Sequence, residues 1–252
     1  TFTGWPATDF VEDLFLRTQG KDAYDGWSNG SIGFSHSSVV ETVKAYCELV
    51  HGTNHVFPNA SSTYFASGAV PMFERDSSGN PHCFMYHGAS FMPDFWTESN
   101  GYTVSNIGTL GVNTTFFPFP KNEIGDEVLA TGGGDYFGIF NLRNETMQVV
   151  KYMAQSDFFS HMAIGAEGAI SISANSAFNT SLYNDAAFPL TSTIAETLSS
   201  TIASDNMRFD ASDLMPENVS AAFMSIITDV FTSNNCTDAY IQSKMEEIDA
   251  AS

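Results

Sequence analysis

The stretch ATGGGDYFGIF, from Ala130 to Phe140, places three consecutive glycines and an aspartate before an apolar, aromatic run. Glycines leave the backbone bare, so a ligand or another segment can approach it closely. A phosphate-binding loop needs a helix directly after such glycines, because the free N–H groups of the helix N-terminus hold the anion. Here the sequence predicts a strand instead, and the Lys-Ser/Thr pair of such loops is absent. Phosphate binding is therefore not expected.

Three other groups of residues have types that could do chemistry. The segment 33–37, GFSHS, lacks the second glycine of a nucleophile elbow, and no predicted strand precedes it. His82, Cys83 and His87 could ligate a metal, but on a strand His82 would face away from the other two, and no second ligand cluster accompanies them. Carboxylates are plentiful, and two at the right separation would suit a glycosidase. We expect no metal and no cofactor, while a glycosidase pair stays an alternative.

Net charge limits the partners of this chain. Its 252 residues include 29 acidic and 9 basic side chains, which gives a formal net charge of −20. Nucleic acids and anionic lipid surfaces would be repelled. Charged residues make up only 15% of the chain, below the roughly 25% of an average domain. This composition suits secretion or a salty medium better than a crowded cytoplasm. The chain has no basic start followed by an apolar h-region, so either it is cytosolic or its signal peptide has been removed, and no apolar run is long enough to predict a membrane span.

Apolar periodicity and turn residues predict an alternation of helices and strands. Helices are expected over 6–20, 38–52, 144–153, 216–230 and 237–248. Short apolar runs between Pro and Gly residues predict strands over 81–90, 116–120, 136–141 and 168–173. Ser38 would begin the second helix through a Ser-x-x-Glu capping box. The pattern predicts an α/β chain whose sheets are covered by helices.

The three cysteines allow one disulfide and one free thiol. They are Cys47, Cys83 and Cys236, and the sequence does not choose the pair. Because Cys47 lies in a helical apolar pattern, we interpret it as a buried free thiol.

Aromatic and small residues recur near predicted strand ends and helix starts. Neutral polyols are bound by such residues, since the apolar face of a sugar packs on Trp, Tyr or Phe while its hydroxyls bond to carboxylates and backbone groups. This combination favours a binding site for a neutral sugar.

Three separated segments strengthen that interpretation. They are TGWPATDFVED from Thr3 to Asp13, the GGGD turn from Gly132 to Asp135, and RFDASDLMP from Arg208 to Pro216, which an apolar helix follows. In order and spacing they resemble the family 1 extracellular solute-binding proteins of ABC importers, and most closely the alpha-glucoside or oligosaccharide-binding branch. The resemblance covers nearly the whole chain. Where that branch usually has a Phe-Trp pair, this chain has Phe223-Met224, which weakens one stacking platform.

The resemblance implies a periplasmic-binding-protein-like fold of type II, in which two hinged lobes hold a sugar between them. It also implies that residues 1–252 are the C-terminal portion of such a protein, with the C-terminal lobe, hinge and crossing segments present and most of the N-terminal lobe absent. The implied function is periplasmic or extracellular capture of a neutral oligosaccharide, of alpha-glucoside type, and its delivery to ABC permease subunits without catalysis. A secreted glycoside hydrolase and a non-catalytic carbohydrate-binding or adhesive domain are the alternatives.

The residues expected to contact the ligand come from these segments and from the aromatics after the predicted 81–90 strand. They are Trp5, Asp9, Phe91, Trp96, Gly133, Gly134, Asp135, Tyr136, Asp210, Asp213 and Phe223. Trp5 would stack on a sugar face, and Asp135 would accept hydrogen bonds from hydroxyls. Each residue has a competing packing role, and Asp210 and Asp213 could instead favour the N-terminus of the next helix.

The net charge generates a prediction about salt. Repulsion among the surplus carboxylates should weaken with salt, because the Debye length falls from about 30 Å at 0.01 M to well under 10 Å at about 0.5 M. The melting temperature should therefore rise over this range in a calorimetric series. A flat or falling series would show that self-repulsion does not limit stability.

Overall fold

The computed structural model describes residues 4–52, 55–103, 107, 113–120, 127–134, 136–158, 172–184 and 189–251. Its α-helices are α1 (Trp5–Gln19), α2 (Lys21–Ser28), α3 (Ser37–Val50), α4 (Val70–Phe73), α6 (Asn144–Met153), α8 (Pro189–Ala203), α9 (Ala211–Leu214), α10 (Glu217–Ser233) and α11 (Asp238–Asp249). Short 3-10 turns cover Ala60–Ser62, Phe65–Ser67, Met92–Phe95, Glu98–Asn100 and Thr180–Asn184. Two strands, β1 (Ala130–Gly132) and β2 (Met207–Phe209), form a parallel pair.

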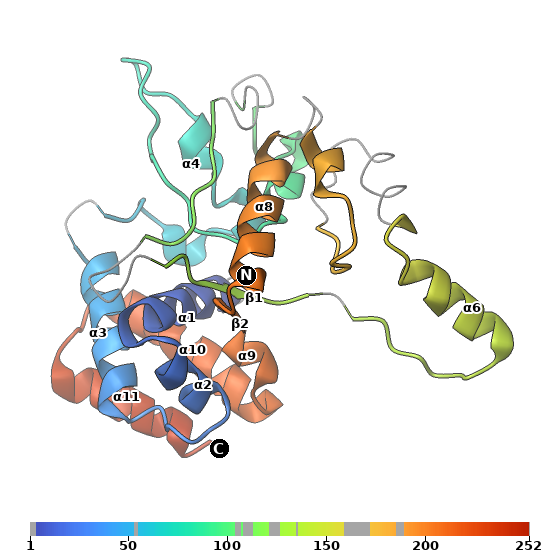
Figure 1. Cartoon of the computed structure of the whole chain (residues 1–252). Helices are drawn as coiled ribbons and strands as arrows, with labels where there is room; N and C mark the ends of the chain where they lie inside the picture. Colours follow the sequence, from blue (N-terminus) through green and yellow to red (C-terminus); the bar gives the residue numbers. More distant parts are fainter. Residues whose placement is uncertain are drawn as a thin grey trace.

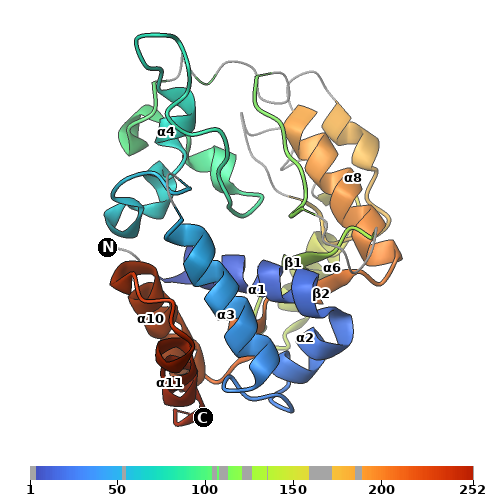
Figure 2. The same cartoon turned by 90° about the vertical axis from the view of Figure 1, so that its left-hand side faces the viewer.

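The helices form two levels in space. In Figure 1, α1, α2, α3, α9, α10 and α11 gather in the lower half, and α4 and α8 lie above them. The quarter turn in Figure 2 places α4 and α8 on opposite sides of the upper half. The strands β1 and β2 lie between the two levels, beside α1. No helix among the described residues is both long and apolar enough to cross a bilayer.

Helix α1 is the element on which the lower level is built. It begins at Trp5 with Pro6 in the first turn, where the fixed φ of proline suits a helix start and no hydrogen bond is lost. It ends before Gly20, whose φ of 84° is in the left-handed region that favours glycine. Its inward positions Val11 and Phe15 are fully buried, and it packs against α2, α3, α10 and β1.

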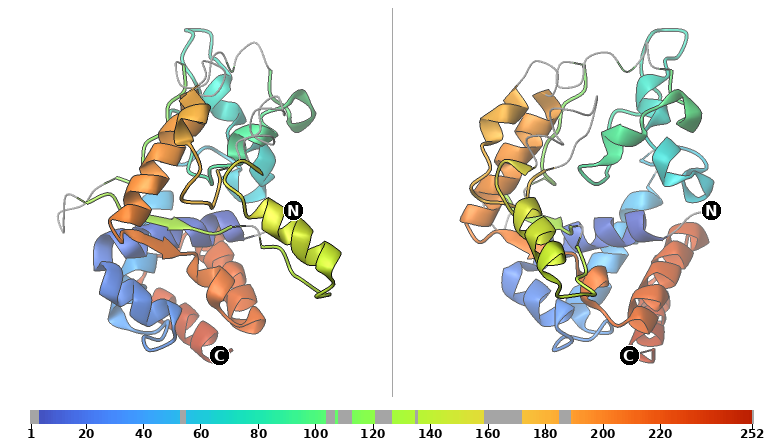
Figure 3. Two further views of the ribbon diagram at one scale, coloured as in Figure 1. Left: turned by 45° about the vertical axis from the view of Figure 1, so that its right-hand side comes forward. Right: turned by 90° about the vertical axis from the view of Figure 1, so that its right-hand side faces the viewer.

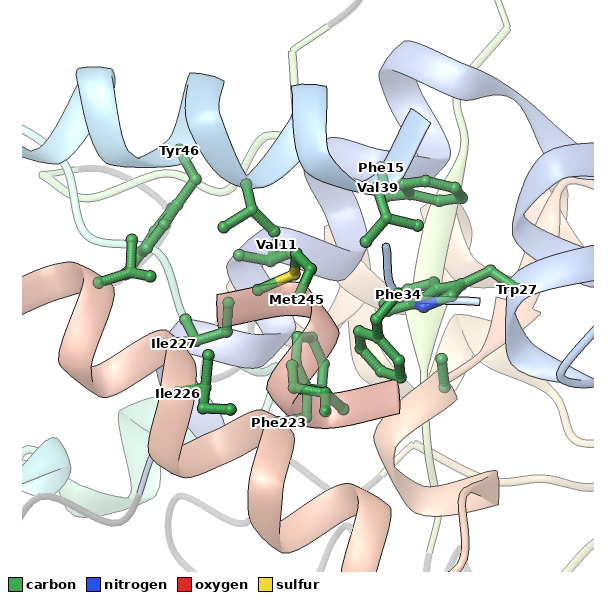
Figure 4. Packing of buried hydrophobic residues seen from close by; sticks show 14 of the residues in the cluster. Val11, Phe15, Trp27, Phe34, Val39, Tyr46, Phe223, Ile226, Ile227 and Met245 are labelled. Carbon is green, nitrogen blue, oxygen red and sulfur yellow. The ribbon is translucent and has the colours of Figure 1, made fainter. Parts of the chain in front are cut away.

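The main hydrophobic core fills the space between α1, α3, α10 and α11. Figure 4 shows its side chains pointing toward one another, with the aromatic rings of Phe15, Trp27, Phe34 and Phe223 at one end. The indole of Trp27 has ring-centroid distances of 4.9 Å to Phe15, 5.5 Å to Phe34 and 5.6 Å to Phe223. This core holds in place α1 and α11, the first and last helices of the described chain.

The helical predictions are confirmed, with small shifts of their ends. The helices predicted over 6–20, 38–52, 144–153, 216–230 and 237–248 correspond to α1, α3, α6, α10 and α11. The capping box at Ser38 is wrong, because α3 begins at Ser37 and the His36 side chain accepts the hydrogen bond from the Ser38 N–H. The short helices α2 and α9, and the longer α8, were not predicted.

Most of the predicted strands are wrong. Residues 81–90, 116–120 and 136–141 are irregular, apart from an isolated bridge between Arg75 and Pro81. Phe84, Phe137 and Phe140 remain exposed, so these apolar runs have not found a buried sheet to join. The strand predicted over 168–173 lies mainly outside the described residues. The sheet instead pairs β1, which ends at the first glycine of the triplet, with β2, and the described chain is mostly helical with a small sheet, which is compatible with an α/β fold.

Residues 136–143 and α6, which together we call the apolar arm, stand away from the body of the molecule. The views in Figure 3 show the segment that follows β1 leading to α6, which projects outward. Phe137, Phe140 and Leu142 are among its most exposed side chains, and Phe140 is fully exposed.

A disulfide joins α3 to the segment before α11. Cys47 and Cys236 are bonded, so the interpretation of Cys47 as a free thiol is wrong. Cys47 is fully buried, as its apolar pattern indicated, but its neighbour in the core is another cysteine. Cys83 is the free cysteine of the three and is half-buried.

This bond generates a prediction about stability. Cys236→Ser should lower the free energy of unfolding by about 2–5 kcal/mol, because the disulfide closes a very long loop in the unfolded chain. Urea unfolding of the parent and the variant measures the difference, and Cys83→Ser is the matched control that should change it little. Equal stability of the parent and Cys236→Ser would mean that the bond does not form in solution.

Candidate functional site

The two strands end side by side next to the first half of α1. In their register Gly132 pairs with Phe209, and the carbonyl of Gly132 accepts a hydrogen bond of 3.0 Å from the Asp210 N–H. A Cβ added at Gly133 would lie 3.3 Å from a carboxylate oxygen of Asp213. The glycine therefore lets the turn pass tightly beside this carboxylate. Ligands commonly bind at the carboxyl ends of parallel strands. The candidate site therefore lies where β1 and β2 end, at Gly132 and Phe209 and the residues that follow them, which we call the strand edge.

Glu12 is a buried carboxylate that holds the first turn of α9. Its oxygens accept hydrogen bonds from the Ala211 N–H at 2.7 Å, the Ser212 N–H at 3.2 Å and the Tyr24 hydroxyl at 3.1 Å. The Tyr24 hydroxyl also lies 3.0 Å from the Phe209 carbonyl at the end of β2. A buried carboxylate is tolerated only when it is paired in this way, so Glu12 ties α1 to α2, β2 and α9.

Asp210 is the N-cap of α9. Its carboxylate accepts hydrogen bonds from the Asp213 N–H at 3.1 Å and from the Ser212 hydroxyl at 2.8 Å. Asp210 therefore has the helix N-terminal role that the sequence allowed for it, and the helix that it caps is α9 rather than α10. The same bonds fix Asp210 and Asp213 in relation to Glu12.

Asp9 lies one helical turn from Glu12 and Asp13 and faces this group of carboxylates. Burial raises the pKa of Asp9 to about 8, and the charges of Asp210, Asp13 and Asp213 add to the effect. The pKa of Glu12 is also raised, by burial and by the charges of Asp210 and Asp9. Because three donors face Glu12 and favour its ionised form, we assign the retained proton to Asp9. At neutral pH, Asp9 is then a hydrogen-bond donor among acceptors.

Aromatic side chains stand beside these carboxylates. Trp5 is one turn before Asp9, so the two share a face of α1. The Trp5 ring lies 5.1 Å from Phe65 and 6.1 Å from Phe91, and Phe65 lies 5.3 Å from Phe95. Phe91 is 41% exposed. Trp5, Phe65, Phe91 and Phe95 form what we call the aromatic wall.

The structure thus brings together most of the predicted site residues. Trp5, Asp9, Phe91, Gly133, Asp210 and Asp213 belong to the aromatic wall or to the strand edge, with Gly134 next in the turn. Tyr136 is exposed, and its ring lies 6.0 Å from Phe209 at the end of β2. Asp135 lies outside the described residues, so its role stays a prediction.

Two predicted residues lie elsewhere. Phe223 is 0% exposed on the inward face of α10 and packs against Trp27 and Phe34, so in this structure it belongs to the core rather than to a surface that a ligand reaches. Trp96 packs against Phe73 and Tyr102 at ring distances of 4.9 and 6.3 Å, in the upper level. Its indole N–H has no hydrogen-bond partner among the described residues.

Sequence reasoning missed Glu12, Phe65, Asp13 and His87. Glu12 and Asp13 stand inside the quoted TGWPATDFVED motif, and their positions one turn from Asp9 carried the signal. Phe65 begins a 3-10 turn and His87 is in an irregular segment, both far from α1 along the chain, and no spacing pattern connects them to α1.

Among the described residues, two groups of side chains have a spacing that could suit a metal. Oxygens of Asp9, Glu12 and Asp210 lie within 4.8 Å of one another, but those of Glu12 and Asp210 already accept hydrogen bonds from the chain. Cys47 and Cys236 lie near His51, and their disulfide removes the thiolates that a metal needs. His82, Cys83 and His87 do not converge, since His87 bonds to Asp13 and Cys83 to the Met85 carbonyl.

Comparison with known proteins gives two informative relatives. The alpha-glucosides-binding periplasmic protein of Rhizobium meliloti (strain 1021) is 34% identical over 137 residues, which are 52% of this chain and 27% of that protein. The osmoprotective compounds-binding protein of Synechocystis sp. (strain ATCC 27184 / PCC 6803 / Kazusa) is 30% identical over 219 residues, which are 85% of this chain and 46% of that protein. The matched part of the chain therefore covers less than half the length of either relative.

No family model and no solved structure matches the chain. The two relatives support the resemblance to solute-binding proteins and are named for binding rather than for catalysis. They do not by themselves define a ligand for this chain.

The raised pKa of Asp9 generates a prediction about pH. In the unfolded chain Asp9 has an ordinary pKa near 3.8, and in the folded chain about 8, so between these values the folded state binds the extra proton. Its contribution to stability is complete below about pH 4, is lost as pH rises to about 8, and then levels off. The slope for one proton is at most about 1.4 kcal/mol per pH unit.

Urea unfolding between pH 4 and pH 9 tests this with two variants. Asp9→Asn should flatten the decline, whereas Glu41→Gln, which removes one exposed charge from α3, should leave its slope unchanged. Parallel curves for the two variants would mean that general charge repulsion, and not Asp9, causes the decline.

Proposed function

We propose that this chain is part of a solute-binding protein that captures a neutral oligosaccharide of alpha-glucoside type outside the cytoplasmic membrane. The observation that carries the proposal is that α1 bears Trp5 of the aromatic wall one turn before Asp9, while Asp9 faces Asp210 and Asp213 at the strand edge. The similarity to an alpha-glucosides-binding protein and to an osmoprotective compounds-binding protein supports it. No covalent chemistry is required of any residue.

The arrangement suits a sugar for a physical reason. A pyranose presents an apolar face, which would stack on Trp5 or Phe91, and a rim of hydroxyls, each of which can donate and accept a hydrogen bond. The neutral carboxyl of Asp9 supplies a donor, and the carboxylate of Asp213 supplies acceptors. A negatively charged solute would be repelled by the remaining carboxylates and by the net charge of −20.

The rest of the assignment extends the same proposal. Residues 1–252 would form the C-terminal portion of a two-lobed, type II binding protein, whose other lobe would close over the ligand. The bound sugar would pass to the permease subunits of an ABC importer in the periplasm or at the cell surface. The two relatives are longer than this chain, and one of them is named as a periplasmic protein, which supports this location.

A glycoside hydrolase is the second candidate, because glycosidases use a pair of nearby carboxyl groups, and Asp9, whose pKa is raised to about 8, has a carboxylate oxygen within 4.8 Å of one of Asp210. Incubation with maltose, trehalose, sucrose and aryl glucosides separates the two functions. Binding without turnover supports the solute-binding proposal. Turnover that Asp9→Asn or Asp210→Asn abolishes would replace it with hydrolysis.

The proposed stacking on Trp5 generates a prediction about affinity. Trp5→Ala should weaken binding of the best sugar by about 2 kcal/mol, or roughly thirtyfold in Kd, as expected for a central aromatic anchor. Calorimetric titration measures this, with sugar up to millimolar concentration because a chain that supplies only part of the contacts binds weakly. Phe140→Ala, which removes a fully exposed ring from the apolar arm, is the control. Unchanged affinity in Trp5→Ala, with intact circular dichroism, would give Trp5 a packing role only.

A further inference from the structure

Asp13 makes hydrogen bonds to two segments that are distant in the sequence. One carboxylate oxygen lies 2.9 Å from His87 Nε2, and the other lies 2.6 Å from the Thr131 hydroxyl and 3.3 Å from the Thr131 N–H. The Asp13 and His87 side chains are only 18% and 27% exposed. A carboxylate only accepts hydrogen bonds, so His87 donates from Nε2. Asp13 thus joins α1, the irregular segment 81–90 and β1.

Each of these three segments carries residues of the proposed binding face. Asp9 and Trp5 lie one and two turns before Asp13 on α1. Phe91 comes four residues after His87, and Gly133 comes two residues after Thr131. The relative positions of the aromatic wall, the carboxylates and the glycine turn therefore depend on the bonds that meet at Asp13.

The segment that contains His87 depends on such bonds more than a helix or strand would. Residues 82–90 are irregular, and among their backbone N–H groups the Cys83 N–H donates to the Pro71 carbonyl. The His87 ring packs against Phe10 at 4.8 Å and Phe119 at 5.9 Å, and such ring contacts constrain its position less sharply than a hydrogen bond does. The Asp13 carboxylate supplies the directional contact that fixes where the segment lies against α1.

The charged surroundings of Asp13 are consistent with this role. Arg17, one turn further along α1, donates to the carbonyls of Phe119 and Glu127, and so holds the chain on both sides of 121–126 against the same helix. The charge of Asp13 also helps to raise the pKa of Asp9. Asp13 therefore acts on the binding face by position and by charge while its own oxygens are occupied.

We propose that Asp13 is a positioning residue for ligand binding, which holds the Phe91 segment and the glycine turn in place against Trp5 and Asp9. This inference rests on the proposed function, because it concerns affinity for the sugar. It assigns no ligand contact to Asp13 itself.

The first test is a double-mutant cycle on sugar affinity. Asp13→Ala and His87→Ala should each weaken binding about tenfold or more, and the double variant should be little weaker than Asp13→Ala alone, because both changes break the same bond. Thr131→Val should weaken binding more than Thr131→Ser, which keeps the hydroxyl. Affinity within twofold of the parent in Asp13→Ala, or additive effects of the two single variants, would overturn the proposal.

Cys236→Ser separates positioning from general loss of stability, because it weakens the fold at a distance from the binding face. All affinities are measured by calorimetry at a temperature where each variant is folded. The proposal predicts that Cys236→Ser keeps the parent affinity while Asp13→Ala does not. An equal loss in both variants would show that affinity follows overall stability and would overturn the assigned role of Asp13.

A readout without sugar distinguishes failure of this inference from failure of the proposed function. Amide hydrogen exchange of Asp13→Ala should quicken over 87–91 and 130–133 relative to Cys236→Ser. If the parent binds no sugar, the proposed function fails, and this local change still reports on positioning. Exchange that is unchanged in these two segments would overturn the positioning role.

Discussion

The fold around the strand edge depends on a buried carboxylate. Glu12 lies inside the protein, and a carboxylate there is tolerated only when donors replace the water that it has lost. Those donors are the first backbone N–H groups of α9 and the Tyr24 hydroxyl. Because Tyr24 also contacts the end of β2, this interaction fixes α1, α2, β2 and α9 together, and it places Asp210 and the glycine turn beside α1.

The same helix, α1, also positions Asp9, Asp13 and Trp5. Asp9 lies one turn before Glu12 and Asp13 directly follows it, and the two aspartates stand in different surroundings, with Asp9 facing the carboxylates and Asp13 occupied by His87 and Thr131. Trp5, the first residue of α1, packs against Phe65 and Phe91 of the aromatic wall. A single helix therefore combines structural carboxylates, a protonated carboxyl and an aromatic ring within three turns, and the proposed sugar site depends on that combination.

The sequence predicted the helices well because each carries its own apolar period and its own end signals, as Pro6 and Gly20 do for α1. It predicted the strands poorly, because short apolar runs such as 81–90 have no local feature that reveals whether a partner strand exists. Trp5, Asp9 and Asp210 could be grouped through the resemblance of their motifs. His87 and Phe65 could not, since their roles arise from contacts across the chain. Cys47 and Phe223 show the limit of reading a helical stripe, which indicates burial but not whether the neighbour is a ligand, a disulfide partner or the core.

The central claim is that a neutral sugar lies against a protonated Asp9, and a carbon-detected NMR titration of the Asp9 carboxyl with and without saturating maltose tests it most directly. The free chain should show a pKa of about 8. Maltose should raise that pKa further, because the sugar removes water from the carboxyl and accepts a hydrogen bond from its neutral form. An Asp9 carboxyl that titrates near its ordinary pKa of 3.8, or whose titration is the same with and without bound maltose, would contradict the account.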